Sequence, residues 1–212
     1  MKKSTINVTS FLLMAIAAAF FVSRPAVALA DGHAYVGESK CEDCHDSQHE
    51  KLAIIGPDGT KSDPVSVWMK DPHHSAFDSL TSDWGKLASQ KASVADPQAD
   101  GSMCLTCHAT GTGGNNPPDP SEGVSCEACH GAAADYVPRD KHGEIGNDPA
   151  KMQAAVALGL IDMRKMDVRE QNCRGCHVVD TSKRPCYRPS EKPFDVHNDH
   201  RFRHWTDNIP PI

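Results

Sequence analysis

Aromatic side chains are scarce in this sequence of 212 residues: they make up 6% of it, and hydrophobic residues as a whole make up 39%. A core built from protein side chains alone would therefore be thin. Basic residues are also outnumbered, 22 against 28 acidic ones, which argues against a nucleic-acid-binding protein with a basic face. We find neither a glycine-rich phosphate-binding loop nor a Ser-His-Asp type of motif. By contrast, nine Cys and twelve His are many for a short chain, which indicates that something other than side chains fills the interior.

The first 30 residues have the three-part pattern of a cleavable secretory signal. A basic start is followed by an apolar run over residues 11–22 and by the small-residue cleavage site Ala28-Leu29-Ala30. A transmembrane anchor is the alternative, but this run is short of the roughly 20 apolar residues that span a bilayer. We expect residues 1–30 to be removed, leaving residues 31–212 as one exported domain without a transmembrane segment. That domain has 19 basic and 28 acidic residues, because the removed segment contains three basic residues and no acidic ones, and its net charge is −9.

The rest of the chain contains four Cys-x-x-Cys-His units. In such a unit the two thiols form thioether bonds to haem c, and the histidine becomes the proximal ligand of the iron. With 12 His among 212 residues, the chance that four Cys-x-x-Cys pairs are all followed by His is on the order of one in 100,000. The sequence therefore predicts four covalently attached haem c groups that form most of the core, and a chain that does not fold without them. The residues are Cys41, Cys44 and His45; Cys104, Cys107 and His108; Cys126, Cys129 and His130; and Cys173, Cys176 and His177.

Two other interpretations of these cysteines are a zinc site and a disulfide framework. The pairs at 104/107 and 126/129 are separated by eighteen residues, which fits a zinc ribbon. An exported chain also permits disulfides. Neither interpretation explains why a histidine follows every pair, so we favour haem c.

The remaining sequence predicts a mainly α-helical chain with extensive loops and little or no β-structure. We expect one helix over Val65–Leu80 and another over Ala150–Met166, the second capped by Asp148 with Pro149 at its first position. Residues 110–123, rich in Gly, Asn and Pro, should form a loop that cannot be a helix. No segment shows a convincing alternation of apolar and polar residues.

Eight histidines remain in the expected mature chain beyond the four motif histidines. A second histidine on an iron gives a six-coordinate haem for electron transfer, whereas an open position can bind a small molecule. We expect His rather than Met as the usual sixth ligand of the iron. We interpret His33 and His49 as surface residues. The eight are His33, His49, His73, His74, His142, His197, His200 and His204.

The order of the four units resembles the tetrahaem cytochrome c-554 family of ammonia-oxidising bacteria. Three segments carry the resemblance: Trp68–Ala76, the third unit with the following Arg139–His142, and Phe194–Trp205. The similarity covers roughly residues 36–205 and is specific at the motifs. It implies a compact multihaem cytochrome c fold with the haems in its core.

The resemblance also implies three distal ligands: His74, His142 and His204. His73 competes with His74, and His197 and His200 lie on the same tail as His204. In the family the haem of the second motif lacks a distal protein ligand, which would leave the iron held by His108 five-coordinate.

The function we expect is a periplasmic electron carrier. The resemblance implies that it accepts electrons from a multihaem oxidoreductase, such as one oxidising hydroxylamine, and passes them to a membrane-linked acceptor or a small cytochrome. The acidic mature chain predicts a basic patch on the redox partner. The alternative is an enzyme that reduces nitric oxide or a related small nitrogen compound at the His108 haem; no residues that would supply its protons are evident.

Overall fold

The computed structural model describes residues 32–46, 54–55, 61–142, 145 and 148–178. Short helices joined by long loops dominate these residues, and the strands β1 (Ile54–Ile55) and β2 (Lys61–Ser62) form a single antiparallel pair. The expected fold class, mainly α with extensive loops and little β, is confirmed. The helices are α1 (Glu38–His45), α2 (Pro64–Met69), α3 (Asp83–Lys91), α4 (Leu105–His108), α5 (Cys126–His130), α6 (Arg139–His142), α7 (Pro149–Ala157) and α8 (Met166–His177), with 3₁₀ turns η1 (Asp78–Thr81) and η2 (Pro120–Glu122).

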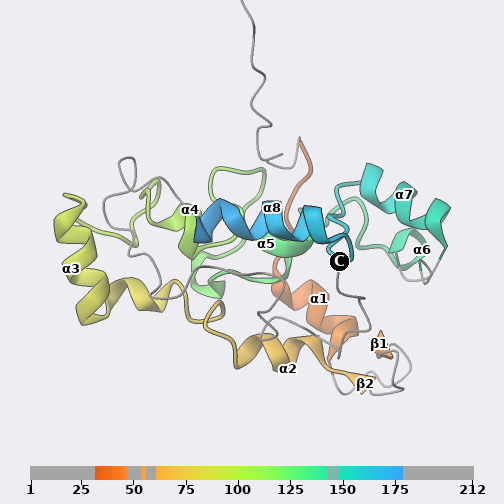
Figure 1. The fold of residues 1–212 in the computed structure, drawn as a ribbon, viewed down its shortest axis with the longest axis horizontal. Helices are drawn as coiled ribbons and strands as arrows, with labels where there is room; N and C mark the ends of the chain where they lie inside the picture. The colour runs from red at the N-terminus through yellow and green to blue at the C-terminus, as the bar shows by residue number, and fades with distance from the viewer. Residues whose placement is uncertain (1–31, 47–53, 56–60, 143–144, 146–147, 179–212) are drawn as a thin grey trace, which may run out of the picture.

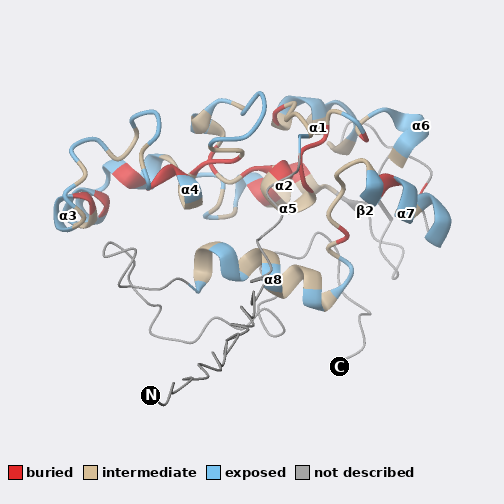
Figure 2. Ribbon diagram, turned by 90° about the horizontal axis from the view of Figure 1, so that it is seen from above, coloured by how far each residue is buried: buried red, intermediate tan, exposed pale blue. Residues whose placement is uncertain are grey.

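In the view of Figure 1, helix α8 crosses the middle of the molecule in front of α5. α3 and α4 lie toward one end, α6 and α7 toward the other, and α1 and α2 lie beyond α5. Seen from above, α8 forms a layer of its own, facing the layer that contains α4, α5 and α1 (Figure 2). Among the described helices, none is long and apolar enough to cross a membrane.

Buried apolar side chains are few and small in the described residues. One cluster joins η1 to α4 through Leu80, Cys104, Leu105 and Ala109, with Phe77 and Val94 packed beside it. Four of the eleven buried hydrophobic residues are alanines, which contribute little apolar area. The protein side chains therefore form a thin core, as the composition predicts. The eleven are Val65, Trp68, Leu80, Cys104, Leu105, Ala109, Ala132, Ala133, Tyr136, Ile145 and Ala155.

The helix expected over Val65–Leu80 is interrupted. It begins at Pro64, capped by the Asp63 side chain, but it ends at Met69 and is followed by turns and by η1. The reason is Pro72, because a residue that precedes proline is disfavoured in the α-helical conformation. The turns that replace the helix contain His73 and His74. Two candidate ligands therefore lie in turns and not in a helix.

The helix expected over Ala150–Met166 is also shorter than predicted. Asp148 caps it as expected, accepting from the backbone N–H groups of Ala150 and Lys151 at 2.9 and 3.3 Å. The helix ends at Ala157 because Gly159 adopts a φ of +104°. A separate helix, α8, starts at Met166.

The segment 110–123 is mostly loop, with one difference from the prediction. Pro120–Glu122 form the 3₁₀ turn η2, with the Asp119 side chain accepting from Ser121 N at 2.9 Å. Proline is compatible with a first helical turn because the backbone N–H that it lacks is unpaired there in any case. The prediction that this segment holds no helix was therefore wrong for these three residues.

Candidate haem-attachment site

Each Cys-x-x-Cys-His unit lies at a helix that ends at the motif histidine. α1 ends at His45, α4 at His108, α5 at His130 and α8 at His177. Positions i and i+3 of a helix lie on the same face, so each unit presents its two thiols side by side. This arrangement suits two thioether bonds along one edge of a planar macrocycle, with the histidine next to them.

Motif helices α5 and α1 are joined by the side chain of Glu127, an intervening residue of the third motif. Glu127 is 2% exposed. Its carboxylate accepts hydrogen bonds from the backbone N–H groups of Val36 (3.1 Å), Gly37 (2.9 Å) and Ala133 (2.7 Å). The chain just before α1 is therefore bound to the third motif. The neighbouring Cys126 thiol, together with burial, raises the pKa of the Cys41 thiol.

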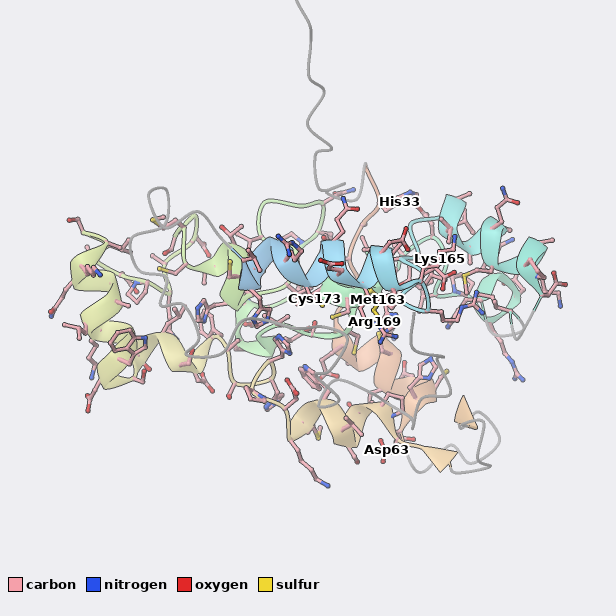
Figure 3. All side chains as sticks on the ribbon, viewed as in Figure 1. His33, Asp63, Met163, Lys165, Arg169 and Cys173 are labelled. Carbon is pink, nitrogen blue, oxygen red and sulfur yellow. The ribbon has the colours of Figure 1, made fainter. Side chains whose placement is uncertain are left out.

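Motif helices α5 and α8 also meet. Asn172 of α8 donates from Nδ2 to the carbonyl of Ala128 at 3.2 Å. Burial, with a smaller contribution from the charge of Cys173, raises the pKa of Cys129 to about 12. The Cys129 thiol therefore keeps its proton at ordinary pH. Figure 3 shows Cys173 in the central part of the molecule, on α8.

Motif helices α8 and α4 are the third contacting pair. The Cys176 Sγ lies 3.9 Å from the carbonyl oxygen of Thr106, an intervening residue of the second motif. These contacts link the second motif to the fourth, the fourth to the third and the third to the first. The second motif is also linked directly to the third, because Ser125 N, just before α5, donates to Thr110 Oγ1, just after α4, at 2.7 Å.

Two of the candidate histidines are oriented by backbone carbonyls. His108 Nδ1 lies 2.7 Å from the carbonyl oxygen of Ala76, and His142 Nδ1 lies 2.9 Å from that of Tyr136. A carbonyl only accepts, so Nδ1 carries the proton and the lone pair lies on Nε2. Metal-binding histidines typically make this outer hydrogen bond. The two side chains therefore fit iron ligation through Nε2.

His142 lies next to the first motif. Its ring centroid is 6.2 Å from that of His45. Tyr136 packs edge-on against His142 with centroids 5.8 Å apart, and its hydroxyl donates to the carbonyls of His130 and Gly131 at 3.0 Å each. Burial raises the pKa of Tyr136, so the hydroxyl keeps its proton. One tyrosine therefore orients both the end of the third motif and the expected distal ligand His142.

The two neighbouring histidines at 73 and 74 point to different surroundings. His73 Nε2 lies 3.5 Å from Nε2 of His177, and the two rings are nearly perpendicular, at 86°. The His74 ring instead packs edge-on against Trp68, with centroids 4.6 Å apart. The structure therefore places His73, and not His74, against His177, the histidine of the fourth motif.

The other spare histidines fall into two groups. His33, expected at the surface, is about three-quarters buried and its Nδ1 lies 2.6 Å from Oδ2 of Asp135. His49, His197, His200 and His204 lie outside the described residues, as does the expected signal segment at 1–30.

The structure also bears on the two alternatives for the cysteines. All eight motif cysteines lie in the described residues and none is half of a disulfide. In the same part of the chain, no group of three or more His, Cys, Asp or Glu side chains is arranged to hold a metal ion. The paired thiols and oriented imidazoles fit haem c.

Sequence reasoning missed three residues of the site: Glu127, Tyr136 and Asp71. The first occupies an intervening position of a motif, where any residue type is allowed. The second and third act through neighbouring histidines, Tyr136 beside His142 and Asp71 with Oδ1 2.8 Å from His73 Nδ1. Asp71 lies in the segment Trp68–Ala76 that carries the family resemblance, but its role is evident only from its contacts in the folded chain.

Two comparisons with known proteins found a match. Residues 40–131 match the family described as cytochrome c554 and c-prime. The chain is 27% identical over 173 residues to the cytochrome c-554 of Nitrosomonas europaea, a match that covers 77% of this chain and 66% of that protein. The match thus spans slightly less than two thirds of the relative's length. No solved structure matches the chain.

Proposed function

The two comparisons support the cytochrome c-554 family, and from that premise we propose that the chain is a periplasmic tetrahaem c-type cytochrome that carries electrons between redox proteins. Haem c, when bound, supplies an iron that changes reversibly between the ferric and ferrous states. The chain itself supplies the thiols, the axial imidazoles and the burial that set the iron's potential. The residues we assign to this role are the eight motif cysteines with His45, His108, His130 and His177.

The observation that carries this proposal is the set of contacts that links the four motif helices. α4 contacts α8 through Thr106 and Cys176, α8 contacts α5 through Asn172 and Ala128, and α5 is bound to the segment before α1 through Glu127. The second and third motifs are also linked directly, through Thr110 and Ser125. Motifs held this closely suit electron transfer between neighbouring haems.

The partners we propose are a multihaem oxidoreductase as donor, such as one that oxidises hydroxylamine, and a membrane-linked or small cytochrome as acceptor. The excess of acidic residues favours a basic docking patch on the partner. Association rates with a basic small cytochrome should fall as ionic strength rises. Rates that do not change with salt would contradict the docking part of the proposal.

The experiment that tests the cofactor is a haem-to-protein ratio combined with low-temperature electron paramagnetic resonance of the oxidised, purified protein. We expect a ratio near four. A ratio near zero would overturn the proposal and return attention to zinc.

A second candidate function concerns the second motif, whose haem the family resemblance implies to be five-coordinate. In the described residues a histidine ring lies beside His45 and beside His177, and His108 contacts the carbonyl oxygen of Ala76 and the Ser79 hydroxyl. An open position there would bind nitric oxide or a related small nitrogen compound. One high-spin ferric centre that changes on addition of nitric oxide would support this function, and four low-spin centres would exclude it.

A further inference from the structure

The segment that carries His73 is held in place by Gly123 and Val124, the residues that precede the third motif. Trp68 donates from Nε1 to the carbonyl of Val124 at 2.9 Å, and Val124 N donates to the carbonyl of His73 at 2.9 Å. Gly123 has a φ of +68°, and a Cβ at this position would lie 2.6 Å or less from the carbonyl oxygens of His73 and His74. The backbone at His73 is therefore fixed relative to α5, and its ring can be held toward α8.

Asp71 orients the His73 ring through two hydrogen bonds. Its Oδ1 accepts from the backbone N–H of His73 at 2.9 Å and lies 2.8 Å from His73 Nδ1. The Asp71 side chain is 9% exposed, against 27% for His73, so the pair is largely shielded from water. An ionised carboxylate only accepts, which places the proton on Nδ1 and the lone pair on Nε2. That Nε2 faces Nε2 of His177 at 3.5 Å.

We propose that Asp71 is a positioning residue that holds His73 as the ligand opposite His177 and, through its charge, makes that imidazole a stronger electron donor. The inference rests on the proposed haem function and concerns the fourth motif. A hydrogen bond from a ligand imidazole to a carboxylate raises the basicity of the ligand. A more basic ligand stabilises the ferric state, so Asp71 lowers the reduction potential of that haem relative to its neighbours.

Asp71→Asn separates the two contributions of this side chain. The amide oxygen still accepts the backbone N–H of His73, so the turn is preserved, but the negative charge beside Nδ1 is lost. In redox titrations of the holoprotein we expect one midpoint potential to rise and the other three to stay in place. The low-spin electron paramagnetic resonance signal of one centre should shift as well, because it reports the imidazole's hydrogen bond and not net charge alone.

The matched control is Asp100→Asn, which removes the same charge at an exposed residue. Asp71→Glu, which keeps a carboxylate, should return the potential toward the wild-type value. Equal behaviour of the two Asn variants would overturn the role of Asp71. A wild-type haem-to-protein ratio far from four would instead overturn the proposed function, so the two failures are distinguishable.

The choice between the two neighbouring histidines has its own test. His73→Asn should convert one low-spin centre to high spin, whereas His74→Asn should leave all signals unchanged. The reverse pattern would overturn the inference and would support His74, the ligand that the family resemblance implies.

Discussion

Glu127 combines two properties that rarely occur together, a carboxylate and nearly complete burial. Its oxygens accept from three backbone N–H groups on two segments that are far apart in the sequence. Hydrogen bonds to a charged acceptor are about twice as strong as those between neutral groups. This residue therefore contributes to the stability of the fold and not only to the local shape of a motif.

Glu127→Gln should lower the free energy of unfolding by about 1–3 kcal/mol, since the amide can satisfy fewer of these donors and leaves its own N–H group buried. Chemical denaturation of the holoprotein measures the change. The control is Asp43→Asn, an intervening residue of the first motif that is 65% exposed and forms an exposed ion pair with Lys40. We expect less than about 0.5 kcal/mol there. Similar losses for both variants would contradict the role assigned to Glu127.

Glu122 makes stability depend on pH. Burial raises its pKa above the ordinary value of 4.5, although Glu122 accepts from the backbone N–H of Glu38. The folded state therefore binds the proton more tightly than the unfolded state does. The contribution of Glu122 to stability is complete below about pH 4.5 and is lost as the pH rises through the folded-state pKa.

Glu122→Gln should remove this dependence. Denaturant midpoints of wild type and variant, measured from about pH 4 to pH 8, should diverge in favour of the variant as the pH increases. Parallel curves would show that the burial of this carboxylate does not affect folding.

At the scale of the element, the sequence predicted some features and missed others for physical reasons. The motifs and the Asp148 cap follow from local chemistry, and both can be read from a few adjacent residues. The end of α2 at Met69 depends on Pro72, and the end of α7 depends on Gly159. Both residues disfavour helix, but the expected helices extend through them because the apolar pattern continues. The pairing of His73 with His177 depends on contacts with Val124, which no local pattern encodes.

Gly131 ends α5 with a φ of +84° and lies against the carbonyl oxygen of Gly159, which would be 2.1 Å from an added Cβ. Gly131→Ala should destabilise the protein by more than about 2 kcal/mol, because backbone strain is combined with a clash against rigid backbone. Gly113→Ala is the matched control, since Gly113 has a φ of +78° with no heavy atom within 4 Å of the added Cβ. It should cost about 1 kcal/mol. Thermal unfolding of both variants checks the difference, and equal shifts would refute the clash.

At the scale of the whole molecule, the composition predicted a thin protein core and the described residues have one. The spatial arrangement of the motifs could not be predicted in this way. It is set by pairs such as Cys176 with Thr106 and Glu127 with Gly37, which lie 70 and 90 residues apart. Contacts between residues so far apart in the chain produce no periodic pattern in the sequence from which they could be predicted.

The chain without haem should not fold. With so few buried side chains, the four attached groups supply most of the apolar contact, and their loss leaves the helices without a common core. Chain produced in a host that lacks haem-attachment enzymes should show no cooperative thermal transition by circular dichroism, whereas the holoprotein should show one. A sharp transition in the haem-free chain would contradict this expectation.

The hydrogen bonds between Glu127 and the segment before α1 also affect the order in which parts of the chain can fold. A ribosome synthesises the first motif some 80 residues before it reaches the acceptor that holds that motif in place. Until Glu127 has been synthesised, the chain lacks the acceptor that binds the N–H groups of Val36 and Gly37 in the folded protein. The first motif can thus be anchored only after the third has been made.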